Sequence, residues 1–135
     1  MNGKKNRHEG SCLCGSITLA VEGDLAPVEA CHCTQCRKWS GHVGVSVEVP
    51  RSDLTIEGTE NLAWFHSSEK VRRGFCKRCG TSLFFDPLDR KKHDWIAIMM
   101  GAFDQPTQTK MALHIFTAEK GDYYEITDGL PQNEH

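Results

Sequence analysis

The cysteines constrain this chain more than any other feature, because all seven lie in three short clusters. Two clusters are pairs, Cys-x-Cys and Cys-x-x-Cys, and the third is the triad Cys-x-Cys-x-x-Cys. A structural zinc takes four ligands at the corners of a tetrahedron, whereas a catalytic zinc takes three and leaves one position open. The cysteines therefore divide into four plus three. The clusters are Cys12 and Cys14; Cys31, Cys33 and Cys36; and Cys76 and Cys79.

The two pairs can together complete one structural metal site. Two residues between Cys76 and Cys79 let the chain turn back, and Gly80 can take the left-handed conformation that closes such a turn. Cys12 and Cys14 are two positions apart, so both side chains face the same way on an extended segment. We predict a four-cysteine zinc site that joins the start of the chain to its middle. Separate buried or redox-active pairs are the alternative, although a redox Cys-x-x-Cys favours a βαβ setting that this sequence does not indicate.

The triad is denser than a structural site requires. Cys31 and Cys33 face one side of an extended segment, and Cys36 follows a tight turn, so three sulfurs can surround one ion. His32 lies between two of these ligands and is expected to point away from them. The fourth position could then accept water or a substrate thiol, which would bind as the nucleophilic thiolate. Alternatively the thiols stay free, or a distant histidine completes the site; the candidates are His42, His66, His93 and His114.

Length and charge limit the classes of function. The 135 residues suffice for one domain with a modest core. A formal net charge of −2 argues against a general nucleic-acid binder, and no apolar run is long enough for a membrane span. The polar start of the chain does not resemble a secretory signal. We therefore expect a cytoplasmic location, where paired cysteines are metal ligands more often than disulfides.

Alternating apolar and polar residues predict a mainly β fold of short antiparallel strands with zinc knuckles between them. One helical turn is expected at residues 34–39. Residues 1–9 are expected to form a flexible polar arm, and residues 10–132 a single zinc-binding domain. The sequence does not indicate an oligomeric state. Strands are predicted at residues 17–21, 43–49, 54–56, 62–66, 81–85, 95–100, 115–116 and 123–126.

The three clusters and the C-terminal part of the chain together resemble the glutathione-dependent formaldehyde-activating enzyme family, which also includes centromere protein V. The resemblance implies a β-tent fold built from antiparallel sheets. It also implies a structural zinc on the four paired cysteines and a catalytic zinc on the triad. The matching segments are residues 10–17, 31–41, 75–83, 114–116 and 124–132.

The activity that the resemblance implies joins the thiol of glutathione to formaldehyde, and is classed as a carbon–sulfur lyase because the reaction is written in reverse. Glutathione carries two carboxylates, so cationic anchors are expected near the triad. No general acid or base is indicated. The alternatives are a zinc-stapled β domain that binds a protein or nucleic-acid partner, and a redox or metal-buffering thiol protein. The candidate anchors are Arg37, Lys38, Arg72 and Arg73.

Overall fold

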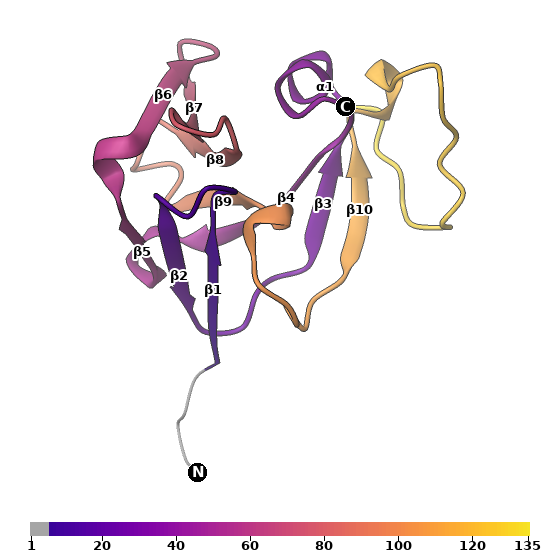
Figure 1. Ribbon diagram of the computed structural model, residues 1–135. Coiled ribbons are helices and arrows are strands. Elements are labelled where there is room, and N and C mark those ends of the chain that lie inside the picture. Colours follow the sequence, from indigo (N-terminus) through magenta and orange to yellow (C-terminus); the bar gives the residue numbers. More distant parts are fainter. Residues whose placement is uncertain (1–5) are drawn as a thin grey trace.

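The computed structural model describes residues 6–135, which form two β-sheets (Figure 1). The three-stranded sheet has the order β1-β2-β5, and the seven-stranded sheet has the order β10-β3-β4-β9-β8-β7-β6. Neighbouring strands are antiparallel, except for the parallel pair β3 and β10. The mainly β fold is thus confirmed. The strands are β1 (Arg7–Ser11), β2 (Thr18–Glu22), β3 (Val28–Cys31), β4 (Gly44–Pro50), β5 (Leu54–Glu57), β6 (Leu62–His66), β7 (Val71–Cys76), β8 (Ser82–Pro87), β9 (Trp95–Met99) and β10 (Met111–Ile115).

The predicted helical turn is the α-helix α1 (Thr34–Ser40). Its N-cap is Cys33, whose sulfur accepts a hydrogen bond from the Cys36 amide, and Gly41 ends it with a φ of 91°. Within the described residues, no helix has the length and apolar character needed to cross a membrane. Short 3₁₀ helices complete the chain: η1 (Arg51–Asp53), η2 (Thr59–Asn61), η3 (Met100–Ala102) and η4 (Thr117–Glu119).

Three observed strands, β1, β3 and β7, lie outside the predicted ones. Strand β1 includes residues 7–9 and buries His8, which corrects the predicted polar arm; residues 1–5 lie outside the described residues. The sequence of β7 does not alternate between apolar and polar residues, because the buried positions include the charged Arg73 and the adjacent Gly74. The strand predicted at residues 123–126 is wrong. Of residues 115–116, only Ile115 belongs to a strand, as the last residue of β10.

The hydrophobic core joins the two sheets. Leu19 of the small sheet belongs to one buried cluster with Val47 and Val49 of β4 and with Ile96 and Ile98 of β9. These core residues occupy alternate positions, so the residues between them point to the opposite face of the large sheet. The fold thereby leaves one face of β4 and β9 free to build a site.

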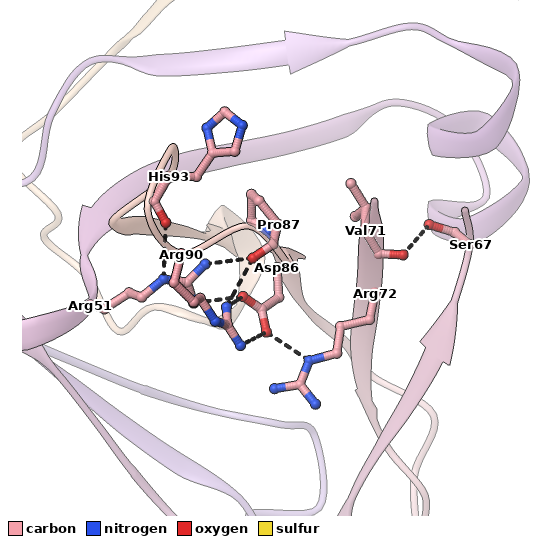
Figure 2. A network of polar contacts seen from close by, with 8 residues as sticks. All are labelled: Arg51, Ser67, Val71, Arg72, Asp86, Pro87, Arg90 and His93. Carbon is pink, nitrogen blue, oxygen red and sulfur yellow. Dashed lines mark hydrogen bonds and ion pairs between the residues drawn. The ribbon is translucent and has the colours of Figure 1, made fainter. Parts of the chain in front are cut away.

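A buried carboxylate ties the end of β8 to its neighbours (Figure 2). Asp86 is 1% exposed and accepts hydrogen bonds from Arg51 at 2.6 Å, from Arg72 at 2.7 Å and from Arg90. Burial raises the pKa of Asp86, but the bonds from Arg90, Arg72 and Arg51 outweigh burial and hold the pKa below its ordinary value. Arg51 also donates to the Pro87 carbonyl at 2.8 Å. This network fixes β7, β8 and η1 together.

Candidate metal centres and the adjoining cavity

The two cysteine pairs meet as the sequence predicts. Their four ligand atoms all lie within 4.8 Å of one another. The sulfurs of Cys12 and Cys14 are 3.7 Å apart, and those of Cys14 and Cys76 are 3.8 Å apart. Four sulfurs around a tetrahedral zinc with bonds of about 2.3 Å would be about 3.8 Å apart. The donor set and its spacing therefore fit a closed metal site.

Two similar knuckles present these sulfurs. Gly15 and Gly80 follow the pairs with φ angles of 78° and 82°. The chain therefore turns back after each pair, as predicted for Gly80. Leu13 donates its amide to the Thr81 hydroxyl at 2.9 Å and thereby joins one knuckle to the other. A hydrogen bond from Thr81 lowers the pKa of Cys79 to about 5, which favours the thiolate that a metal requires.

The triad also forms one group. Cys31 ends β3, Cys33 caps α1 and Cys36 lies in the first turn of that helix. Their sulfurs lie within 4.8 Å of one another, and no fourth cysteine, histidine or carboxylate among residues 6–135 joins the group. The alternative in which a distant histidine completes the site finds no support in this geometry. The triad offers three soft donors and fits a metal with an open position.

His32 points away from the triad, as the sequence predicts. Its Nδ1 lies 2.5 Å from the Tyr124 hydroxyl, and its Nε2 lies 2.8 Å from Nδ1 of His114. His114 in turn contacts Asp128 at 2.8 Å. Burial lowers the pKa of His32, and His114 lowers it further, which favours the neutral ring. This chain of contacts anchors the Cys31–Cys33 segment from behind.

A cavity of about 370 Å³ opens beside the triad, and all three triad cysteines line it. It lies on the face of β4 and β9 opposite the core. Apolar side chains form most of its wall, which suits a site that excludes water. The two strands contribute alternate residues, namely Gly44, Ser46 and Glu48 from β4 and Trp95, Ala97 and Met99 from β9.

Only one of the four candidate anchors lines this cavity. Arg73 is 4% exposed, and its two terminal nitrogens lie 3.8 and 3.9 Å from the Cys36 sulfur. The contact with Cys31, together with the nearby Arg73, lowers the pKa of Cys36 to about 6. Arg72 points elsewhere, toward Asp86, with its guanidinium 3.8 Å from the centre of the Trp64 ring. Arg37 and Lys38 lie on α1 outside the lining of the cavity.

Sequence patterns miss two carboxylates in the cavity wall. Glu29 lies two positions before Cys31 on β3, and Glu48 lies between the core valines of β4. Side chains two positions apart on a strand share a face, so the spacing of Glu29 from Cys31 is the signal in the sequence that could have found it. Glu48 could have been found in the same way, because residues that alternate with core valines lie on the opposite face. Burial raises the pKa of Glu48, and the charge of Glu29 raises it further. Glu48 can therefore exchange protons at a pH closer to neutrality than an ordinary glutamate.

Phe116 also lines the cavity and was not indicated by the sequence. It has a φ of 55°, which is costly for a residue with a side chain. The following 3₁₀ helix is held in place because the Glu119 carboxylate accepts hydrogen bonds from the amide and hydroxyl of Thr34, at 3.1 and 3.0 Å. The start of α1 and the Phe116 side of the cavity are therefore coupled.

Comparisons with known proteins identify a family and similar chains. A family model described as glutathione-dependent formaldehyde-activating enzyme matches residues 7–119. A Halomonas elongata protein, provisionally named as such an enzyme, is 27% identical over 128 residues, covering 87% of this chain and 80% of that protein. A crystal structure of a Rhodobacter sphaeroides protein has a TM-score of 0.58 and 20% identity, covering 92% of this chain and 98% of that one. That structural likeness supports the fold alone.

Shorter matches fall in eukaryotic proteins. A Schizosaccharomyces pombe protein named an uncharacterized lyase is 35% identical over 78 residues, which cover 58% of this chain and 56% of that protein. An Aspergillus flavus protein, also provisionally named as a formaldehyde-activating enzyme, is 34% identical over 77 residues, covering 54% of this chain and 40% of that protein. These matches span about half the length of the two relatives.

Proposed function

Because the chain belongs to the glutathione-dependent formaldehyde-activating enzyme family, we propose that it is a zinc-dependent carbon–sulfur lyase acting on a thiol–aldehyde adduct. The thiol is a small one such as glutathione, and the aldehyde is formaldehyde. The observation that carries the proposal is the triad at the wall of a cavity, with three sulfurs within 4.8 Å and no fourth ligand from residues 6–135. A closed site would leave no place for a substrate thiol.

The proposed metals are one structural zinc on Cys12, Cys14, Cys76 and Cys79 and one catalytic zinc on the triad. The four paired sulfurs support the first, because their spacing fits a tetrahedron without an outside ligand. Zinc bound to the triad would supply a Lewis acid that keeps an added thiol in its thiolate form. The proposed cytoplasmic location agrees with thiols that stay reduced.

The chain's own residues would position the reactants and handle the proton. In the forward direction the substrate sulfur forms a bond to the formaldehyde carbon, and the C=O π electron pair moves to oxygen. The proton lost by the thiol equals the proton gained by that oxygen, so the addition needs no other reactant. Glu48 lines the same cavity four residues along β4 from Gly44, which adjoins Cys36, and its pKa is raised, so it would take up the first proton and return it to the oxygen through bound water. The apolar walls would limit the access of bulk water, which competes for formaldehyde.

The charges around the cavity support a place for each end of glutathione. Glu29 could hold the ammonium group, because its carboxylate lines the same wall as the triad. A neighbouring cavity of about 610 Å³ shares Phe85 and Trp95 with the first, and its charged lining residues include Lys70 and Lys92 beside Glu69 and Asp89. These lysines could hold the two carboxylates. In this proposal they would take the role predicted for Arg37, Lys38 and Arg72, which do not line the cavity beside the triad.

The test is the rate at which free formaldehyde and its glutathione adduct interchange, measured by exchange NMR on the purified full chain. We expect metal analysis to find two zinc ions and the interchange to be faster with the protein than without it. Cys33→Ser should abolish the acceleration while the structural zinc and the fold persist. Cys76→Ser should instead unfold the chain or make it insoluble. A protein with both zinc ions and no acceleration would refute the proposed reaction.

A further inference from the structure

Arg73 is a buried charge without a carboxylate partner. Its exposed fraction is 4%, yet among the described residues no aspartate or glutamate oxygen lies within 4.0 Å of its guanidinium. The next residue on the strand behaves differently, because Arg72 is bound to Asp86 at 2.7 Å. Burying an unpaired charge is strongly unfavourable, so a compensating anion is expected near Arg73.

The Cys36 sulfur is placed to be that anion. Both terminal nitrogens of Arg73 face it, at 3.8 and 3.9 Å. Two further contacts fix the direction of the guanidinium, from Nη2 to the Gln35 side-chain oxygen at 3.4 Å and from Nε to the Ser67 hydroxyl at 3.2 Å. The ring centre of Phe85 lies 5.0 Å from the guanidinium carbon. The guanidinium is therefore aimed at the triad and held there.

We propose that Arg73 is a positioning residue that balances the charge of the triad and so permits an anionic fourth ligand to bind. Three thiolates and one Zn²⁺ carry a net charge of −1, which the guanidinium brings to zero. A substrate thiolate then joins a neutral group instead of an anionic one. The inference rests on the proposed function for its substrate. It assigns Arg73 to the metal ligand Cys36, in place of a carboxylate of the substrate.

The first experiment replaces the triad zinc by Co²⁺ in the full chain, because Co²⁺ absorbs visible light and reports each new ligand. Glutathione is titrated into the wild type, Arg73→Gln, Arg73→Lys and the control Arg90→Gln, which removes a guanidinium bound to Asp86. Arg73→Gln should weaken glutathione binding by about tenfold or more, Arg73→Lys should recover most of the affinity, and Arg90→Gln should match the wild type. Neutral imidazole should bind Arg73→Gln and the wild type within about twofold, since no charge is involved.

The outcomes separate the two proposals. Equal glutathione affinity in the wild type and Arg73→Gln would overturn the role of Arg73 and leave the proposed function standing. Equal losses for glutathione and imidazole would also overturn it, because they would indicate a purely structural effect. Failure of the wild type to bind any thiol would instead count against the proposed function.

A second measurement does not depend on thiol binding. Urea unfolding of the full chain is compared for Cys36→Ala, Arg73→Met and the double variant, and the same cycle is repeated with Cys33→Ala. Removing Cys36 alone leaves the Arg73 charge unpaired. In the Cys36→Ala background, Arg73→Met should therefore stabilise the protein, lowering the equilibrium constant of unfolding by about tenfold. The Cys33 cycle should be additive. Equal coupling in both cycles would overturn the proposed pairing.

Discussion

Replacing Asp86 with asparagine should test how much the buried carboxylate contributes to stability. The substitution keeps the shape and one oxygen acceptor but removes the charge that three guanidiniums share. The side chains of Arg51 and Arg72 are 25% and 28% exposed, so their pairs with Asp86 are shielded from water, whereas Arg90 is 44% exposed. Charge-assisted hydrogen bonds each contribute about 1.5–3 kcal/mol, but the arginines can partly regain water. We expect Asp86→Asn to lower the free energy of unfolding by about 3 kcal/mol.

The assay is urea unfolding of the zinc-loaded protein, with thermal unfolding as a second measure. A loss of about 3 kcal/mol in a chain of this size corresponds to a melting temperature lower by about 10 °C. Arg90→Gln should cost less than about 1 kcal/mol, because the Arg90 side chain is 44% exposed and Asp86 keeps its bonds from Arg51 and Arg72. Asp94→Asn removes an exposed carboxylate and should be neutral.

The pH dependence of the stability difference between the wild type and Asp86→Asn tests whether the carboxylate is ionised in the folded protein. The pKa of Asp86 is lowered in the folded state, so its contribution is present above the unfolded value of about 3.9 and is lost as the pH falls through the folded value. The difference between wild type and Asp86→Asn should therefore stay constant from about pH 8 to about pH 6. A difference below about 1 kcal/mol, or one that narrows over this range, would show that the carboxylate is not held as an ion by the arginines.

Three further predictions concern the sites. Cys76→Ser should lower the zinc content and stability together, whereas Cys33→Ser should lower zinc by one ion and leave the melting temperature within about 5 °C; similar melting curves for both would contradict the division of roles. Glu48→Gln should reduce the rate of adduct formation. In the wild type this rate should fall in acid at a pH above the pKa of an ordinary glutamate, and the variant should lack that fall. An unchanged dependence of the rate on pH would exclude Glu48 as the base. Phe116→Gly should be more stable than Phe116→Ala by about 1 kcal/mol in thermal unfolding, because glycine tolerates the positive φ; the reverse order would show that this backbone is not strained.

Much of the fold and the grouping of the triad follow from local spacing. Cys31, Cys33 and Cys36 approach one another through a strand end, a cap and one helical turn, all within six residues, so short-range geometry is sufficient. The meeting of the two pairs required only the count of ligands that zinc prefers. Alternation of apolar residues predicted β4 and β9 because one face of each is core.

The cavity residues could not be predicted in the same way, because they depend on which strands become neighbours. Arg72 and Arg73 are identical in type and adjacent, yet one binds Asp86 and the other faces Cys36. As neighbours on β7 they point to opposite faces of the sheet, and the pairing of β7 with β8 and the position of α1 decide which groups each of them meets. Glu48 was overlooked for a related reason, since a polar residue between core valines is expected only to face solvent, whereas the exposed Glu48 also lines the cavity.

The contacts behind His32 have a consequence for protein engineering. The hexapeptide from Cys31 to Cys36 contains all the sulfurs of the triad, but Tyr124, His114 and Asp128, from the last quarter of the chain, hold its middle in place. Grafting the hexapeptide alone onto another scaffold would transfer the three sulfurs without the support that orients them. A transplant that also carries the parallel strand β10 and the tail to residue 128 would bring that support with it.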